Sequence, residues 1–456
     1  MTDSKSSDLG AEKVGRLLFR LAIPAVTAQI VNVLYNMVDR IYVGHIQEIG
    51  AQALTGLGVC MPLILIISAF AALVGSGGAP RASILMGEGK LKGAEKILGN
   101  CFTALLLIGG TLTVFFLIFN DRLLLMFGAS ENTIKFASGY MRIYTCGTIF
   151  VQLALGLNSF ITAQGLAKTS MISVLIGAVC NIILDPIFIF GLHMGIEGAA
   201  LATVISQAVS SIWVLRFLTG PKSLLKIRLK NLRLSPKVIF PCLALGLSPF
   251  VMQSTESIIA ICFNSSLLKY GGDLAVGAMT ILSTIMQFSM LPLTGLIQGG
   301  QPIIGYNFGA KNAGRVKETF KIELKAAVIY TVVLWLLVMI FPQFFVRIFT
   351  GDTALISFSA WAMRIYMSAF LFFGVRMVCQ QTFVAIGYAK TSLFLAILRK
   401  IILLVPLIYV LPNLFTDQVM GVFLAEPIAD MIAVTAVSIT FSIQFKKALE
   451  VLKNNS

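Results

Sequence analysis

The sequence contains few charged residues and almost no histidine. Asp, Glu, Lys and Arg together make up 12% of its 456 residues, and there are two His. This is too little polar surface to solvate a globule, so a water-soluble protein is excluded. The motifs HExxH, GxSxG and Walker A do not occur, and both His fall in expected external loops. We therefore predict that the protein is not an enzyme. The seven Cys are an odd number, all in apolar runs and without a CxxC pair, which argues against disulfides and a metal centre.

Apolar residues, in contrast, are abundant. They make up 57% of the chain, and the mean hydropathy is +0.90. Glu48 and Arg81 bracket 32 residues without Asp, Glu, Lys, Arg or His, and Lys96 and Asp121 bracket another 24. About 20 apolar residues are enough to cross hydrocarbon as a helix, so both stretches can span a membrane. The chain is therefore predicted to be an all-α integral membrane protein.

Twelve transmembrane helices are predicted from the apolar spans. No cleaved signal peptide is expected, because the first apolar run is too long for one. The approximate spans are 17–44, 52–80, 97–119, 136–159, 169–191, 196–218, 238–268, 275–304, 324–346, 354–384, 393–411 and 418–444.

Basic residues gather in alternate joints between these spans. Most of the 35 Lys and Arg fall in segments assigned to one side of the membrane, namely 5–20, 81–96, 168, 216–237, 311–325, 390–400 and 446–453. The other side has Arg40, Arg122, Lys135, Lys269 and Arg347. Because Lys and Arg near helix ends resist translocation, both termini are predicted to be cytoplasmic. The net charge of +15 is thus assigned to loops beside anionic membrane lipid, and no nucleic-acid partner is expected.

The chain repeats itself at one interval. GGAPRASILMG at 77–87 aligns with GGQPIIGYNFG at 299–309, MRIY at 141–144 with MRIY at 363–366, and AQGLAKTS at 163–170 with AIGYAKTS at 385–392. Each pair is 222 residues apart. An interval of six helices returns the chain to the same side, which predicts two pseudo-symmetric six-helix lobes of parallel topology around a central cleft. This architecture is typical of alternating access.

The repeat also sets the predicted domain boundaries. They are a cytoplasmic amino-terminal tail at 1–16, an amino-terminal six-helix lobe at 17–220, a basic cytoplasmic linker at 221–237, a carboxyl-terminal six-helix lobe at 238–445 and a cytoplasmic carboxyl-terminal tail at 446–456.

One apolar run contains an unexpected carboxylate. In CNIILDPIFIFG at 180–191, Asn181 and Asp185 are four residues apart and so share a helix face. A carboxylate within hydrocarbon costs roughly 2.5 to 3.5 kcal/mol on insertion scales, so Asp185 needs a partner, a proton or a cation. Pro186 has no amide hydrogen for the carbonyl of Ile182, which leaves an acceptor nearby. These oxygens predict a site for a hydronium or a hard cation, although Asp185 could instead cap or kink the helix.

Several motifs together resemble a known family. The two six-helix halves, GGQPIIGYNFGA at 299–310, NMVDRIYVG at 36–44 and NIILDPIFIFG at 181–191 look like those of the multidrug and toxic compound extrusion (MATE) transporters. The similarity is to the bacterial branch with the staphylococcal pump and the DinF-like proteins, and it covers essentially the whole chain. It implies a multidrug efflux antiporter of the bacterial plasma (inner) membrane, which gives antibiotic resistance by exporting bulky lipophilic, often cationic drugs.

The resemblance also implies a cation-coupling set. Its members are Asp39, Asn181, Asp185 and Thr203, with H+ or Na+ as the coupling ion, no other cofactor, and no metal other than sodium at this site. The position 222 residues after Asp185 is Leu407, so the second lobe lacks this carboxylate. Two alternatives stay open: Asp39 could form a surface ion pair with Arg40, and Thr203 could bond only within its helix.

Other candidates have less support from the residues. Glu256 resembles an acidic position of the family's seventh helix and is predicted to act in secondary coupling or drug attraction. Pro24 is the predicted bending point of the first helix. Met and Phe suit a promiscuous pocket because they adapt to many shapes. Glu426 and Asp430 are interpreted as a structural network or a second proton site. The candidates for substrate binding are Asn32, Tyr35, Gln152, Asn158 and Met171.

Two further expectations complete the sequence-based interpretation. The protein is expected to be a monomer. The alternative function is a flippase for a lipid-linked substrate on the same two-lobe architecture. A flippase predicts a cationic cavity for phosphate groups, whereas the acids favour a cationic cargo.

Overall fold

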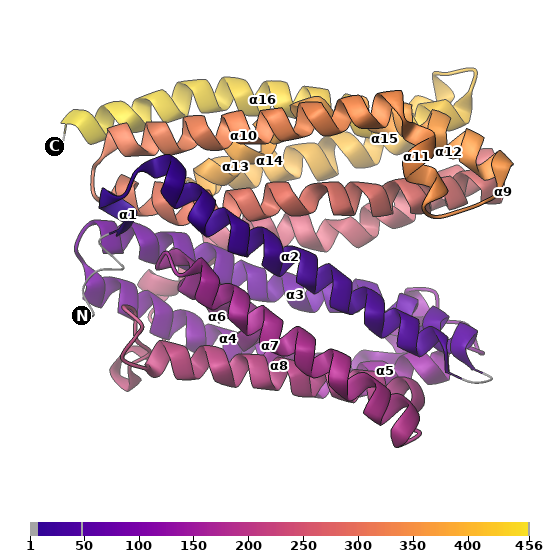
Figure 1. Cartoon of the computed structure of the whole chain (residues 1–456), viewed down its shortest axis with the longest axis horizontal. Coiled ribbons are helices and arrows are strands. Elements are labelled where there is room, and N and C mark those ends of the chain that lie inside the picture. The colour runs from indigo at the N-terminus through magenta and orange to yellow at the C-terminus, as the bar shows by residue number, and fades with distance from the viewer. Residues whose placement is uncertain (1–7, 47–48, 455–456) are drawn as a thin grey trace.

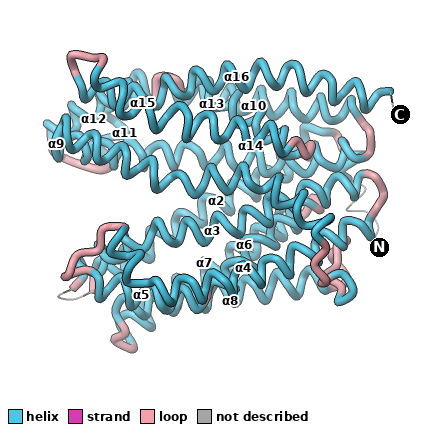
Figure 2. The backbone as a smooth tube through the Cα atoms, turned by 180° about the vertical axis from the view of Figure 1, so that it is seen from behind, coloured by secondary structure: helices cyan, strands magenta, loops and turns pink. Residues whose placement is uncertain are grey.

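A computed structural model describes residues 8–46 and 49–454 of the chain, and no strand occurs among them. Two bundles of long helices lie side by side, and both ends of the chain lie at the same end of the molecule (Figure 1). At that end the two bundles approach each other, and they diverge toward the opposite end (Figure 2). The helices are therefore arranged as two lobes that meet at the end with the termini.

The amino-terminal lobe contains six passes. A short helix α1 (Asp8–Ala11) precedes them. The passes are α2 (Val14–Gly44), α3 (Gly50–Gly87), α4 (Leu91–Met126), the pair α5 (Ile134–Cys146) and α6 (Thr148–Ala163), α7 (Ala167–Pro186) with the π-helix η1 (Ile187–Gly191), and α8 (Gly195–Thr219). The pair α5 and α6 is bent by 58°.

The carboxyl-terminal lobe follows after a linker with the single turn η2 (Leu229–Asn231). Its elements are α9 (Pro236–Gly309), α10 (Ala313–Ile340), α11 (Pro342–Arg347), α12 (Thr353–Tyr366), η3 (Phe370–Phe372), α13 (Phe373–Ala385), α14 (Ala389–Ile397), the π-helix η4 (Leu398–Leu404), α15 (Val405–Val410), η5 (Leu411–Asn413) and α16 (Gln418–Asn454). The α12 and α13 segments form a second bent pass, at 46°.

The predicted number of twelve passes is confirmed. Among the described residues, nine helices are long and apolar enough to cross a membrane, or eleven when each bent pair counts as one span. The 74-residue α9 contains a non-helical residue, Gly272, with φ of 63° and ψ of −162°. Glycine tolerates positive φ without a steric penalty, so α9 is two helices joined by a tight reversal. Counting it as two gives twelve, with the break between the predicted spans 238–268 and 275–304.

Helix ends follow local chemistry. Asn312 caps α10 by accepting a hydrogen bond from the backbone N–H of Arg315 at 3.1 Å, and Asp352 caps α12 by accepting one from Ala354 at 2.8 Å. Pro236 begins α9, where the missing N–H costs nothing. The linker is held to the amino-terminal lobe, because Asn100 accepts a hydrogen bond from the backbone N–H of Ser235 at 2.7 Å.

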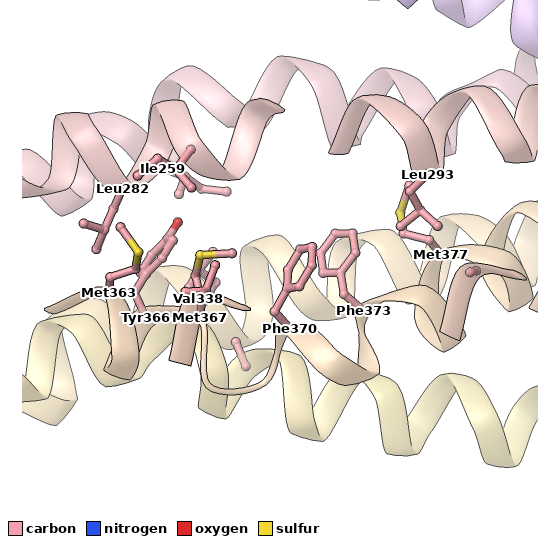
Figure 3. Close-up of a cluster of buried hydrophobic side chains, with 14 of the residues drawn as sticks. Ile259, Leu282, Leu293, Val338, Met363, Tyr366, Met367, Phe370, Phe373 and Met377 are labelled. Atoms are coloured by element: carbon pink, nitrogen blue, oxygen red, sulfur yellow. The ribbon is translucent and has the colours of Figure 1, made fainter. Parts of the chain in front are cut away.

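The largest of the apolar clusters lies mostly in the carboxyl-terminal lobe, includes residues such as Leu17 and Leu18 of α2, and is drawn in part in Figure 3. Met363, Met367 and Met377 contribute flexible thioethers that fill irregular gaps. The rings of Phe370 and Phe373 stack, with centroids 5.6 Å apart and an interplanar angle of 16°. Much of the lobe's methionine and phenylalanine is therefore used for packing.

The ends of the repeated glycine motifs form one of the close contacts between the lobes. A Cβ atom added to Gly87 of α3 would lie 1.9 Å from the carbonyl oxygen of Tyr306, and one added to Gly309 of α9 would lie 1.9 Å from that of Ile84. Gly87 and Gly309 are one repeat interval apart, and so are Ile84 and Tyr306. The two contacts are thus equivalent under the pseudo-two-fold axis. Glycine is required at both because α3 and α9 approach at backbone distance.

We expect Gly309→Ala to separate the lobes at this end. The added methyl group cannot fit without moving the backbone of α3 or α9, and such overpacking typically costs about 1–3 kcal/mol. Spin labels at the exposed positions Lys92 and Lys317, which follow the two glycine turns, should report longer and broader distances. The control is Gly58→Ala in α3, since no described atom lies within 4 Å of its added Cβ. An unchanged distance distribution in Gly309→Ala would refute the packing argument.

One predicted placement needs revision. Arg399 and Lys400, assigned above to the basic side of the membrane, are 6% and 5% exposed and lie inside the carboxyl-terminal lobe on η4. In the described part of the predicted tail, the short helix α1 packs against α9. Leu9 is buried, and its carbonyl oxygen accepts hydrogen bonds from Asn307 at 2.9 Å and from Arg315 at 3.1 Å.

Candidate functional site

The carboxylate of the CNIILDPIFIFG run lies in a buried polar group on α7 and α8. Asp185 is 0% exposed and Asn181 1%. The amide nitrogen of Asn181 donates to Oδ1 of Asp185 at 3.2 Å and to Oγ1 of Thr203 at 3.4 Å. One turn of α7 therefore places the amide between the carboxylate and the hydroxyl, as the four-residue spacing predicts.

Asp39 of α2 lies near this group. It is 6% exposed, and it lies close enough to Asp185 for the two carboxylates to interact electrostatically. Tyr35, one turn earlier on α2, is also within electrostatic range of both acids. The structure thus brings Asp39, Asn181, Asp185 and Thr203 together. Because Asp39 is buried, the alternative of an exposed ion pair with Arg40 loses support.

Three oxygen atoms of the group are left without hydrogen-bond partners. Within the described part of the chain, Oδ1 of Asp39, Oδ1 of Asn181 and Oδ2 of Asp185 are buried and accept no hydrogen bond. Buried acceptors without a donor are unfavourable, and carboxylates above all. A proton or a small hard cation would satisfy them. No group of three His, Cys, Asp or Glu in the described ranges is placed to hold a metal ion.

The backbone changes pitch immediately after this group. The α-helix α7 ends at Pro186, and η1 continues it as a π-helix with Leu192 N–H bonded to the Ile187 carbonyl at 2.8 Å. Proline removes an α-helical donor, and π-turns occur frequently at functional sites. The residue order Asp-Pro therefore places the carboxylate next to a wider and less regular turn.

A cavity of about 240 Å³ adjoins the group. Asn181 and Thr203 lie in its wall, whereas Asp39 and Asp185 do not and so stand behind that wall. Four of the five substrate-binding candidates also line it: Asn32, Tyr35, Asn158 and Met171. The cavity extends to the other lobe through α9, where Gln298 accepts a hydrogen bond from Gln29 at 3.3 Å. We call it the amino-terminal cavity.

The lining of this cavity is made mostly of small and neutral polar residues. The described lining contains no Phe and one Met, and most of its residues are Ala, Ser, Gly, Asn, Gln or Thr. No Lys, Arg, Asp or Glu contributes to it within the described residues. Small side chains create the space, and amides and hydroxyls offer neutral hydrogen bonds. Asp39 and Asp185 are therefore not positioned to contact a molecule in the cavity directly.

Gln152 lies away from the cavity. Its side chain is 0% exposed, and its amide nitrogen donates to the carbonyl oxygen of Ile67 at 2.7 Å. This bond joins α6 to α3, which is a packing contact. The sequence could not distinguish Gln152 from Asn158, because both are single amides in the same apolar span.

Glu256 lies in the other lobe, apart from the four coupling candidates. Its carboxylate forms an ion pair with the ammonium of Lys400. Glu426 and Asp430 pair with Arg399, each at 2.5 Å. Sequence reasoning missed these pairs because it placed both basic residues in or near a loop. The available signal was the adjacency of two bases to the long apolar run that follows them.

Comparisons with known proteins agree with this architecture. A model of the MatE family matches residues 24–187 and 249–410. The multidrug export protein MepA of Staphylococcus haemolyticus is 25% identical over 435 residues, 95% of each chain, and MepA of Staphylococcus aureus (strain N315) is 25% identical over 431 residues, 93% of each. The solved structure of the MATE multidrug transporter DinF-BH, a complex with a bound compound, is 34% identical, with a TM-score of 0.87, over 95% of this chain and 97% of that one.

A second solved structure supports the fold alone. It is the outward-facing conformation of a multidrug resistance MATE family transporter, with a TM-score of 0.90, 24% identity and 99% of both chains covered. The fold and site thus define a multi-pass membrane protein with two lobes and a buried polar site in the amino-terminal lobe. The family match covers more than half of the chain, so the chain belongs to the MatE family of MATE transporters.

Proposed function

We propose that the protein exports bulky lipophilic, often cationic drugs in exchange for H+ or Na+. The main observation in support is that three buried oxygens, on Asp39, Asn181 and Asp185, have no hydrogen-bond partner and lie next to a cavity lined by uncharged residues. A cation in the cavity and an ion on these oxygens would compete for the same negative field. The MepA relatives are named multidrug export proteins, and the 34% identical DinF-BH multidrug transporter was solved with a compound bound, which supports a drug as the cargo.

The transport cycle follows from two states of the lobes. In the proposal the lobes rock about the cavity, and Pro24 in α2 is the point where that helix bends when the charge at Asp39 changes. The cycle needs only a differential affinity, since a tenfold preference of the drug for the ion-free form is about 1.4 kcal/mol of coupling. The protein acts as a monomer in the bacterial plasma membrane, with both termini in the cytoplasm.

The flippase alternative receives no support from the site. A lipid-linked substrate carries phosphate groups, which call for Lys or Arg. The described lining of the amino-terminal cavity contains neither. A cationic cargo beside two buried acids is therefore the better match.

Flux through purified protein in liposomes tests the function and identifies the ion. We expect uptake or release of a fluorescent lipophilic cation to follow an imposed proton gradient or an imposed sodium gradient. A response to the proton gradient alone assigns H+, and a response to the sodium gradient alone assigns Na+. Empty liposomes provide the control for leakage. If neither gradient changes the flux, antiport is rejected.

A further inference from the structure

The carboxyl-terminal lobe contains six charged side chains that the proposed function does not use. Three are basic and three acidic: Arg376, Arg399, Lys400, Glu256, Glu426 and Asp430. All except Glu256 are at most 6% exposed. Arg399 donates from Nε to Asp430 and from Nη2 to Glu426, each at 2.5 Å. Arg376 lies 3.6 Å from Asp430 and 4.0 Å above the ring of Phe373. The group is electrically balanced.

The three bases lie at positions that are equivalent, by the 222-residue repeat, to residues lining the amino-terminal cavity. Gly165 and Gly387, one interval apart, both have positive φ, 78° and 83°, so the register holds in the structure at this point. The residues 222 positions earlier are Ala154 for Arg376, Gly177 for Arg399 and Ala178 for Lys400. All three counterparts line the amino-terminal cavity.

Gln380 extends the correspondence, because its counterpart Asn158 also lines the amino-terminal cavity. Small residues open the space in one lobe, and long basic side chains occupy the matching space in the other.

The π-helix η4 explains how two adjacent bases both face inward. Neighbouring residues of an α-helix point in directions about 100° apart, so one of them would normally face outward. Arg399 and Lys400 are nevertheless both buried, and they bind different acids. The wider π-turn over Leu398–Leu404 supplies this geometry.

Lys400 and Glu256 form an ion pair of their own within the network, although Glu256 is also within electrostatic range of Arg399 and Arg376. The Lys400 ammonium donates to Oε1 of Glu256, with the lysine side chain 6% exposed and the glutamate side chain 58% exposed. The carboxylate is accessible, whereas the ammonium is enclosed by the lobe. A carboxylate on a membrane-spanning helix is unfavourable without a neighbouring cation. Here the chain itself provides that cation, the Lys400 ammonium.

We propose that the carboxyl-terminal lobe contains a second cation site that is closed by a tethered cation, the Lys400 ammonium on Glu256. The site's ligand class is a small primary ammonium ion, because that is the group it already holds. One consequence rests on the proposed function: Lys400 keeps the Glu256 carboxylate neutralised through the cycle, so Glu256 does not bind the exchanged ion. Glu256 then does not attract the drug, in contrast to the role that its sequence position suggests.

Removing the tether should open the site to an external ammonium. We expect ethylammonium chloride to raise the melting temperature of the purified full-length Lys400→Ala protein by about 2 °C or more, through binding to the folded state. Unmutated protein should shift by less than half as much, because Lys400 occupies the site. The double variant Lys400→Ala/Glu256→Gln should also fail to respond. Tetramethylammonium, which cannot donate hydrogen bonds, is the matched salt, and Lys269→Ala on the exposed surface of α9 is the matched variant.

The possible outcomes decide the proposal. A shift confined to Lys400→Ala with ethylammonium supports it, and equal shifts in all proteins, or none in Lys400→Ala, overturn it. If Lys400→Ala does not fold, Lys400→Met and Lys400→Met/Glu256→Gln replace it. The double variant removes both charges and should then give several times more folded protein than the single one. Equal yields would overturn the proposal. Neither measurement involves transport, so a failure of antiport leaves both results valid.

Discussion

Asp185→Asn is expected to abolish drug export while leaving the protein folded and inserted. Asparagine has the same shape and can still accept the hydrogen bond from Asn181, which is 3.2 Å long in the structure. It cannot ionise, so it cannot exchange a proton or a sodium ion for the cargo. The measurement is resistance of cells to a lipophilic cation such as ethidium, with the amount of membrane protein checked on blots. We expect resistance to fall to the level of cells without the transporter.

The neighbouring acid gives an independent check. Asp39 lies within electrostatic range of Asp185 and has its own unpartnered oxygen, so Asp39→Asn should reduce export in the same direction. Two interacting carboxylates titrate as a pair, and removing either changes the behaviour of both. The control is Asp273→Asn, an exposed carboxylate near the reversal of α9. Full resistance in cells with correctly inserted Asp185→Asn protein would remove the coupling role.

Asp185 could be singled out from the sequence because an acid in an apolar helix is energetically unfavourable, whereas the set with Asp39 and Thr203 came from the resemblance to MATE transporters. Asp185 and Asp39 are rare charges in long apolar runs, and the four-residue spacing places Asn181 on the same face as Asp185. The structure brings these residues together with Thr203. The residue types could not reveal the three unpartnered oxygens, which depend on how α2, α7 and α8 pack.

Other features of the site depend on tertiary packing and were beyond the sequence. The cavity is lined by small residues such as Ala154 and Gly177, which in an isolated sequence look like ordinary helix packing positions. Gln152 and Asn158 are six residues apart on one helix, yet only Asn158 reaches the cavity. Met and Phe suit a promiscuous pocket, but their number in the sequence does not show which of them line one. The described lining contains one Met and no Phe, and residues such as Met377 and Phe370 pack in the carboxyl-terminal core instead (Figure 3).

The fold was predictable to a large extent because the repeat interval constrains it. A constant spacing of 222 residues between GGAPRASILMG and GGQPIIGYNFG requires two similar lobes, and the structure pairs these motifs across the lobe interface. The charge rule misplaced Arg399 and Lys400. It treats each base near the end of an apolar span as facing water, and it cannot foresee that acids on α9 and α16 neutralise the two bases inside the lobe.

Arg399→Met is expected to be the most destabilising single substitution in the carboxyl-terminal lobe. Arg399 binds two carboxylates at once, Glu426 and Asp430, each at 2.5 Å and each with a side chain no more than 8% exposed. Methionine fills a similar volume but leaves both acids without their main counter-charge. Removing one partner of a buried ion pair costs about 3–5 kcal/mol, mostly because an uncompensated charge stays buried. We expect a clearly lower melting temperature of the purified protein and a lower yield from membranes.

Neutralising Glu426 and Asp430, the acids that lose Arg399, should restore much of that stability. In Arg399→Met/Glu426→Gln/Asp430→Asn the side chains keep their shapes and the buried charges are gone, although Arg376 then loses its contact with Asp430 at 3.6 Å. We therefore expect partial recovery of the melting temperature. In the Arg399→Met background, Glu426→Gln alone should recover less than Glu426→Gln and Asp430→Asn together. Arg142→Met is the matched control, because its pairing with Asp121 at 3.1 Å is exposed on both sides and such pairs contribute about 0–1 kcal/mol. A triple variant no more stable than Arg399→Met would mean that the arginine acts through packing on Phe373, whose ring centroid lies 5.9 Å from its guanidinium, and not through its charge.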